Sequence, residues 1–315
     1  MRRAGLALAL VLALPATASA QTPPEPTLTV SAQDVFGGSR PVALTGRSFT
    51  ARVVMRPYVA GETVTLRLYR GGRKIRVKAL TLKSVAGGAA GVATLKVKSG
   101  KPGRLRLSAS HKGTAVLKPL SAKSVRLTAV RPSAGPGAKG AVVRLLQSRL
   151  AAMHYVVPRS GVYDAGTGRA VMAWRKLAGL ARTTIASQEV FNGLLAGRGK
   201  FKVRHPGDGR HVEARLNSQV LALINGSRVE RIYHTSSGAP ATPTVRGKFR
   251  VYLKTPGINA KGMVDSSYFI RGYAIHGYAS VPPYNASHGC LRVPVPNARS
   301  IYDWLRIGDV VWVEP

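Results

Sequence analysis

Two short runs near the C-terminus carry the residues that could do chemistry. The second run ends in Cys290, directly preceded by Ser287, His288 and Gly289, and the first run contains His276. Cys290 is the only cysteine of the chain, so it cannot form a disulfide within it. A thiol attacks as its thiolate and is mostly protonated at neutral pH, so it needs an imidazole to take its proton. The pattern therefore predicts a cysteine nucleophile, with His276 and His288 as candidate bases.

Glycine occurs beside both reactive positions, because Gly277 follows His276 and Gly289 precedes Cys290. Glycine adopts backbone conformations that are closed to other residues and lets a substrate approach closely. The backbone N–H groups of Gly289 and Cys290 are therefore candidates to stabilise the oxyanion that forms when a thiolate adds to a carbonyl.

A zinc site is the competing interpretation of the same residues. His276, His288 and Cys290 could supply three ligands of a tetrahedral site. However, the sequence has no H-x-x-E-H motif, and a metal-bound thiolate would lose its nucleophilicity while the glycines would serve no purpose. We therefore expect no metal and no organic cofactor.

The two runs resemble the L,D-transpeptidase (YkuD-like) catalytic domain, whose signature is a histidine followed by Ser or Thr and then His-Gly-Cys. Two upstream blocks extend the resemblance. Residues 235–249 contain T-S-S-G and T-P-T-V-R-G-K-F, and residues 268–277 read Y-F-I-R-G-Y-A-I-H-G. About the last third of the chain is covered.

The resemblance implies a role for each residue of the two runs. Cys290 is the nucleophile and His276 the general base. His288 assists charge stabilisation or substrate placement, and Ser287 and Gly289 shape the turn. The family often orients its base through a backbone carbonyl, which the resemblance places at the residue after His276 or the one following.

The carbonyl expected to orient His276 is that of Gly277 or Tyr278. Side chains near these residues are also candidates to bind the substrate. Tyr268 and Tyr278 flank the cleft and are expected to border the site of the acyl donor. Arg292 replaces the asparagine of many members, so its guanidinium is a candidate to bind a substrate carboxylate. An ion pair at the rim, to Asp303 or Asp309, is the alternative.

The implied reaction is transpeptidation of peptidoglycan stem peptides. The nucleophile attacks the third-position carbonyl of a tetrapeptide stem, releases D-alanine, holds the stem as a thioester and passes it to the amine of a second stem. Two alternatives remain open. Water could resolve the thioester, which would give an L,D-carboxypeptidase, or the chain could be a non-catalytic cell-wall-binding protein.

A helical segment precedes this region at residues 138–197. Apolar residues at helical spacing fall in 142–153 and again in 170–178. Residues 143–147 and 161–171 resemble the first helix and the signature of the small three-helix peptidoglycan-binding domain. Trp174 and Arg175 occupy positions where that family usually has Phe and Gln, so glycan binding and a purely spacing role both remain open.

Short alternating segments fill residues 27–130. Apolar and polar residues alternate in 63–70, Gly71 and Gly72 provide a hairpin turn, and the pattern resumes in 75–82. The region resembles immunoglobulin-like modules of exported bacterial proteins and is expected to be a spacer or an adhesion module. We therefore expect a multidomain, mainly β chain with a β-sandwich (27–130), a helical domain (138–197) and a β-rich catalytic domain (208–315).

The N-terminus and the charge indicate export to the cell wall. Residues 1–20 have a basic start, a short apolar run and an A-S-A exit, which is typical of a cleaved signal peptide. Without them the chain carries 46 Lys or Arg against 12 Asp or Glu, a net charge of +34. We expect a monomer without a membrane span, in the periplasm, cell wall or medium.

Basic residues concentrate in residues 63–163, which contain 21 Lys or Arg and no Asp or Glu. Such a charge would suit nucleic acid, but in an exported protein the expected polyanions are wall polymers rather than DNA. The predicted partners are thus peptidoglycan stem peptides and glycan together with anionic wall polymers. Solvated faces that favour solubility are the alternative.

Overall fold

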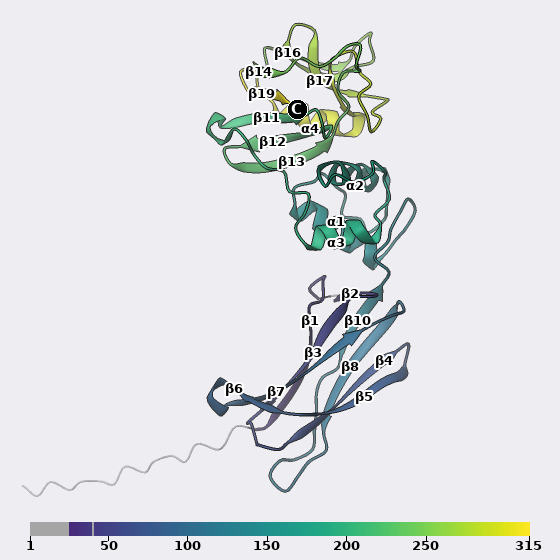
Figure 1. Cartoon of the computed structure of the whole chain (residues 1–315), viewed down its shortest axis with the longest axis vertical. Coiled ribbons are helices and arrows are strands. Elements are labelled where there is room, and N and C mark those ends of the chain that lie inside the picture. The colour runs from purple at the N-terminus through teal and green to yellow at the C-terminus, as the bar shows by residue number, and fades with distance from the viewer. Residues whose placement is uncertain (1–24, 40) are drawn as a thin grey trace, which may run out of the picture.

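The structure is a computed structural model that describes residues 25–39 and 41–315. The predicted signal peptide, residues 1–20, lies outside the described residues. Figure 1 shows three parts arranged along one long axis, a β-sandwich, a group of helices and a second β-rich part. The expected mainly β, multidomain fold class is confirmed. No helix in the described part of the chain is long and apolar enough to cross a membrane.

The N-terminal part is a sandwich of two sheets. Its elements are β1 (Thr27–Gln33), β2 (Val42–Leu44), β3 (Ser48–Arg56), β4 (Thr63–Arg70), β5 (Arg73–Thr81), β6 (Lys83–Val85), η1 (Ala86–Gly88), β7 (Ala90–Lys98), β8 (Gly103–His111), β9 (Leu120–Ser121) and β10 (Val125–Val130). One sheet has the order β1-β3-β7-β6 and the other β2-β10-β8-β4-β5, with β9 paired to β8. Alternate side chains of both sheets, such as Phe49 and Leu107, meet in the core between them.

The edge strand β5 is less buried than its sequence pattern predicts. Its alternating sequence predicts one buried face, yet Ile75 and Val77 are 44% and 48% exposed. β5 lies at the edge of its sheet. Alternation fixes which residues share a face, but burial also requires a layer on top of that face.

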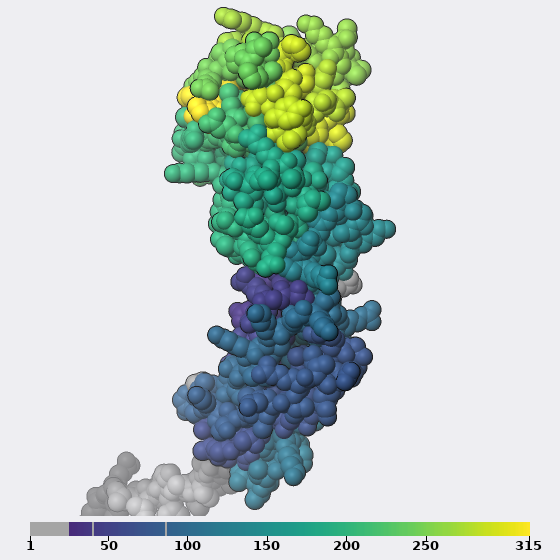
Figure 2. Space-filling view, turned by 45° about the vertical axis from the view of Figure 1, so that its right-hand side comes forward, coloured from purple at the N-terminus to yellow at the C-terminus, as the bar shows by residue number. Residues whose placement is uncertain are grey.

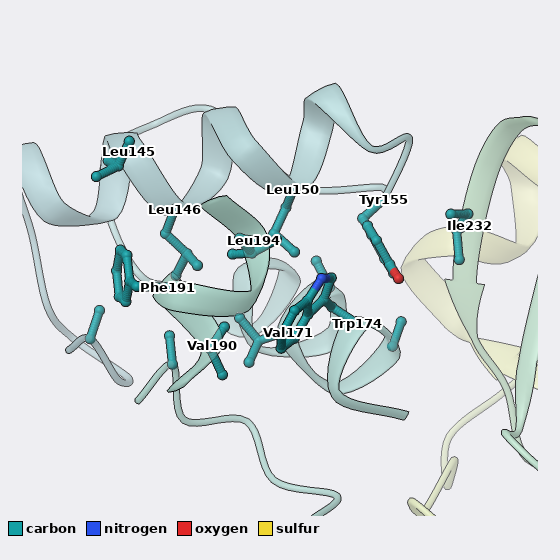
Figure 3. Close-up of a cluster of buried hydrophobic side chains, with 14 of the residues drawn as sticks. Leu145, Leu146, Leu150, Tyr155, Val171, Trp174, Val190, Phe191, Leu194 and Ile232 are labelled. Carbon is teal, nitrogen blue, oxygen red and sulfur yellow. The ribbon is translucent and has the colours of Figure 1, made fainter. Parts of the chain in front are cut away.

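Three helices form the middle part, α1 (Ala141–Ala152), α2 (Ala165–Leu177) and α3 (Gln188–Leu195). The Asp164 carboxylate caps α2 by accepting from the Thr167 N–H at 2.8 Å. Figure 3 shows the apolar faces of the helices converging on Trp174, which is fully buried. The same core includes Leu44 from the sandwich and Ile232 from the C-terminal part. Figure 2 shows the helical part in contact with both neighbours.

The C-terminal part contains two sheets, one α-helix and a short 3-10 helix. Its elements are η2 (Pro206–Asp208), β11 (Arg210–Arg215), β12 (Val220–Asn225), β13 (Arg228–His234), β14 (Gly247–Arg250), β15 (Leu253–Ile258), β16 (Val264–Ile270), β17 (Tyr273–Tyr278), β18 (Leu291–Pro294), α4 (Val295–Trp304) and β19 (Val310–Glu314). The sheets have the orders β13-β12-β11-β19-β14 and β15-β16-β17-β18. A core that includes Phe269 and Ile275 joins them. The second sheet carries both predicted catalytic runs.

Candidate active site

The parallel pairing of β17 with β18 brings the two reactive runs together. His276 is the register partner of Arg292, and Ile275 is the partner of Leu291. Cys290 immediately precedes β18, one residue before the register pair of Ile275 and Leu291. The Ala274 N–H of β17 lies close enough to its sulfur to lower the pKa of the thiol. Segments that are separate in the sequence thus become neighbours in one sheet.

The pleat of β17 and β18 divides their side chains between a buried core face and the opposite face. Ile275 and Leu291 point into the buried core of this part. Side chains alternate along a strand, so His276 and Arg292 lie on the opposite face. Ala274, two residues before His276 on β17, shares that face. Neighbouring strands are about 5 Å apart, so the backbone at Cys290, one residue before Leu291, lies beside the β17 segment that carries His276.

The His276 ring is held in a defined orientation. It is 3% exposed, and its Nδ1 atom donates to the carbonyl of Gly277 at 2.9 Å. Nε2 therefore keeps the lone pair that can accept a proton. Burial lowers the pKa of the imidazole, the Gly277 carbonyl raises it, and the positive charge of Arg292 lowers it further. The imidazole is therefore neutral at neutral pH.

Close packing from α4 supports this strand from its other side. A Cβ atom built on Gly277 would lie 2.6 Å from the Cβ atom of Ala298. Only glycine therefore lets α4 approach the backbone that carries His276.

The Cys290 thiol is half-buried and protonated at rest. Burial raises the pKa of the thiol, whereas the Ala274 N–H and the charges of Arg292 and Lys261 lower it. Its Sγ atom lies 3.7 Å from the carbonyl oxygen of Gly272, a hydrogen-bond contact in which the S–H donates. The raised pKa of the thiol and the lowered pKa of the His276 imidazole both favour the neutral forms of these groups at neutral pH.

The turn that presents the cysteine, which we call the cysteine turn (residues 287–290), is closed by its own side chain. The Ser287 hydroxyl donates to the carbonyl of Cys290 at 2.6 Å, and the Gly289 N–H donates to Ser287 Oγ at 3.1 Å. The Gly289 N–H is thus engaged within the turn, in contrast to the free oxyanion donor that the sequence suggests. Gly289 has φ of +113°, a region that L side chains rarely adopt.

A second segment braces the cysteine turn. The Ser287 carbonyl accepts from the Ala239 N–H at 2.8 Å and from the Thr242 hydroxyl at 3.0 Å. Arg292 and Ser236 exchange two backbone hydrogen bonds at 2.9 and 3.0 Å. These bracing residues all fall in the first of the two upstream blocks, residues 235–249, so that block has a structural role as a support for the turn.

Arg292 is placed on an aromatic ring instead of against a carboxylate. Its guanidinium lies 4.1 Å from the ring centroid of Tyr278 and donates to the Ala286 carbonyl at 3.2 Å. Asp303 and Asp309 each pair with a different arginine, which contradicts the alternative of a rim ion pair. The Tyr278 ring in turn meets His276 edge-on, with ring centroids 5.7 Å apart.

Two further predicted residues have different placements. Tyr268 is half-buried on β16 and is the register partner of Ala274, so it lies two strands away from Cys290 on the same sheet. His288 is exposed, and its ring makes no hydrogen bond or ion pair with the described residues. The structure thus brings His276, Arg292 and Tyr278 together but does not attach His288 to them.

Residues of the helical part contribute contacts that the sequence does not indicate. Arg182 donates to the Pro283 carbonyl at 2.8 Å and to the Asn217 carbonyl at 2.7 Å. The buried Lys176 reaches His234, which has no reactive neighbour in the sequence. Such contacts leave no local signal, because they join segments far apart along the chain.

Potential metal ligands do not cluster in the described residues. Within 25–39 and 41–315, no group of three or more His, Cys, Asp or Glu side chains is placed to hold a metal ion together.

Two segments of the chain match known protein families. Residues 209–313 match the L,D-transpeptidase catalytic domain (YkuD), and residues 139–194 match a putative peptidoglycan-binding domain. No curated protein matches the chain.

Among solved structures, an L,D-transpeptidase from Xylanimonas cellulosilytica is 32% identical, with a TM-score of 0.55, and the match covers 58% of this chain and 98% of that one. An L,D-transpeptidase from Mycobacterium tuberculosis is 19% identical, with a TM-score of 0.32 and coverages of 34% and 58%. The catalytic domain of an E. faecium L,D-transpeptidase is 23% identical, with a TM-score of 0.30 and coverages of 34% and 97%.

The fold and the matched segments define a cell-wall protein in which a peptidoglycan-binding domain precedes a catalytic domain. The chain belongs to the L,D-transpeptidase family.

Proposed function

We propose that the chain is a cysteine-dependent L,D-transpeptidase that cross-links peptidoglycan stem peptides and releases D-alanine. The observations that carry this proposal are the β17–β18 register, which pairs His276 with Arg292 two residues after Cys290, and the hydrogen bond that fixes the His276 ring on the Gly277 carbonyl. Membership of the family and the peptidoglycan-binding match support a cell-wall substrate. They also suggest an extracytoplasmic location, and the proposed signal peptide would direct export.

The first half of the reaction forms an acyl-enzyme. His276 Nε2 takes the thiol proton while Cys290 Sγ bonds to the carbonyl carbon of the third residue of a tetrapeptide stem. The resulting oxyanion collapses, the carbon–nitrogen bond to the terminal D-alanine breaks, and His276 returns the proton to the leaving amine. The stem remains attached as a thioester.

The second half transfers the stem. The side-chain amine of another stem adds to the thioester carbonyl and loses a proton to His276, and the sulfur then leaves and is reprotonated. Each half passes through one oxyanion. The Gly289 N–H would stabilise this oxyanion by donating to it in place of its present hydrogen bond to Ser287 Oγ.

Arg292 and the two tyrosines have proposed substrate roles. Arg292 carries its charge on the Tyr278 ring at the edge of the site, where a substrate carboxylate can approach it. Tyr268 borders the same sheet face further from the sulfur. His288 is exposed, which fits contact with bound substrate better than support of the resting thiol.

Incubation of the purified protein with tetrapeptide stems, followed by mass spectrometry, tests the proposal. A dimer lacking one D-alanine is the expected product. A trimmed monomer would identify an L,D-carboxypeptidase, and an unchanged stem would identify a non-catalytic wall-binding protein.

Two variants connect the product to the site. Cys290→Ala should abolish dimer formation, and His276→Gln should reduce it by about 100-fold or more, the usual size of a general-base contribution. Both should still sediment with purified sacculi, because the helical part that matches the peptidoglycan-binding domain is unchanged. Dimer formation by Cys290→Ala at the normal rate would refute the mechanism.

A further inference from the structure

A groove of about 850 Å³ lies between the N-terminal sandwich and α1, in a different part of the chain from Cys290. One side is formed by β4, β8 and β10 together with the turn at Gly71 and Gly72, and α1 forms the other side. In Figure 1 the ends of β2 and β10 lie just below the helical part, and both strands contact α1. The groove therefore lies where two parts of the molecule meet.

The residues that line this groove are strongly basic. Of the described residues, five arginines and no Asp or Glu face it. The arginines come from both sides: Arg104, Arg106, Arg126, Arg144 and Arg149. None of the five forms an ion pair in the part of the chain that the structure describes. Charges from two parts of the protein thus converge on one concave surface.

Two of these arginines lie directly opposite each other. Arg106 on β8 is the register partner of Arg126 on β10, and its partner on the other side, in β4, is Tyr69. Like charges opposite each other on neighbouring strands destabilise a sheet. An anion between the two guanidinium groups would remove this repulsion, so the arrangement favours a bound anion over an empty groove.

Aromatic rings hold two of the guanidinium groups in place. Arg106 lies 3.8 Å from the ring centroid of Tyr69, and Arg149 lies 5.1 Å from that of Phe36. Stacked guanidinium groups keep their N–H donors free at the edge and lose less conformational freedom when they bind an anion. Basic residues that serve only solubility need neither convergence nor such positioning.

We infer that this groove binds a linear anionic cell-wall polymer through its phosphate or carboxylate groups. Guanidinium groups pair with both kinds of oxyanion in two-point contacts. An open groove with charges along both sides suits a chain that passes through it. The cell-wall context comes from family membership, and the site itself does not depend on the proposed reaction.

Direct binding to fluorescent polymers tests the inference. The full chain is titrated with poly(glycerol phosphate), with polygalacturonate, with neutral dextran and with duplex DNA at several salt concentrations. Binding to at least one of the two anionic wall-type polymers should weaken steeply as the salt concentration rises. The arginines displace counterions from the polymer when they bind, and added salt opposes this release. Whichever of the two binds distinguishes phosphate from carboxylate as the recognised group.

A groove variant and a matched control locate the site. The triple variant Arg104→Gln, Arg126→Gln and Arg144→Gln changes three exposed residues of the groove. It should weaken polymer binding by about tenfold or more. The control Lys78→Gln, Lys83→Gln and Lys96→Gln removes the same charge from exposed positions outside the groove and should cost about twofold or less, through long-range charge alone.

Thermal unfolding separates a binding role from a structural one. The polymer should raise the Tm of the parent protein but not that of the groove variant, whose own Tm should equal or exceed that of the parent because the opposed charges are gone. Equal loss of binding in both variants, or no binding of either anionic polymer by the parent, would overturn the inference. Tighter groove-dependent binding to duplex DNA would overturn the assignment to a wall polymer.

Discussion

The amine of Lys176 on α2 lies 2.7 Å from the Nδ1 atom of His234 at the end of β13. It also donates to the carbonyls of Gln219 and Thr235 at 3.0 Å each. On its other side the His234 ring donates from Nε2 to the carbonyl of Val281 at 2.9 Å. One buried amine of the helical part is thus connected, through a single imidazole, to the segment that leads into the cysteine turn.

Replacing Lys176 by methionine should destabilise the protein and slow stem turnover. The change leaves two carbonyls and one imidazole nitrogen without their donor in a site where the lysine is 5% exposed. Unsatisfied buried polar groups typically cost 1–3 kcal/mol each, so a loss of about 2–4 kcal/mol is expected. Thermal unfolding and dimer formation measure the two effects. The exposed Lys200→Met is the control, and an equal Tm in both variants would contradict the prediction.

Acid should weaken the same junction. Burial and the charges of Lys176, Arg169 and Arg182 lower the pKa of His234 from 6.5 to about 4, although the Val281 carbonyl raises it. The folded protein therefore resists protonation that the unfolded chain accepts. The fold therefore has its full stability with respect to this group above pH 6.5 and loses stability as the pH falls towards about 4. At that pH the loss of unfolding free energy is about 3 kcal/mol.

His234→Gln tests this dependence, because glutamine can accept from Lys176 and donate to Val281 without titrating. Between pH 6.5 and 4 the variant should lose less stability than the parent protein in denaturant titrations. Folding also lowers the pKa of carboxylates elsewhere, such as Glu213. These groups add the same pH dependence of stability to the parent protein and to the variant. Identical pH profiles would exclude His234 as a source of acid sensitivity.

Local patterns predicted the strands and the reactive run, whereas contacts between distant segments were not predictable. Alternation and the signature around Cys290 are properties of neighbouring residues, so they are visible in the sequence. The buried state of Lys176 depends on how α2 packs against β13, and a lysine on a helix is normally solvated. His234 had no reactive neighbour in the sequence and gains its partners only by folding.

The hydrogen-bond partner of His276 was predictable only as a choice between two carbonyls, and the structure has it at Gly277. The contact of Tyr273 with Gly289 was not predictable, because it depends on the register and curvature of two strands. Sequence patterns therefore specify which residues can react, and the packing of the sheet determines which backbone groups surround them.

The dependence of activity on pH should reflect a neutral thiol–imidazole pair. The pKa of His276 is lowered below 6.5 by burial, so kcat/KM should stay high at pH 6.5 and fall only at lower pH, as the base is protonated. The pKa of Cys290 is raised above 9.0, chiefly by burial, so alkylation by iodoacetamide should be slow at neutral pH and should accelerate beyond pH 9.

Mass spectrometry of the alkylated protein across this range provides the measurement, with free glutathione as the reference thiol. Alkylation at a constant high rate from pH 5 to 9 would indicate a preformed thiolate–imidazolium pair and would contradict the neutral resting state.

Gly289→Ala should disable the cysteine turn by a steric conflict. A Cβ atom at this position would lie 1.8 Å from Cε1 of Tyr273, and the φ of +113° strains any L side chain. Either the ring or the turn must move, and a displacement of about 1 Å at a reacting group can cost about 100-fold in rate. Gly272→Ala is a matched control, because its Cβ atom would have no neighbour within 4 Å. Removing the ring in Gly289→Ala/Tyr273→Ala should restore part of the dimer formation, since it relieves the clash but not the backbone strain. Dimer formation by Gly289→Ala at the rate of the Gly272→Ala control would show that the turn tolerates a side chain and that the close contact with Tyr273 has no role in placing Cys290.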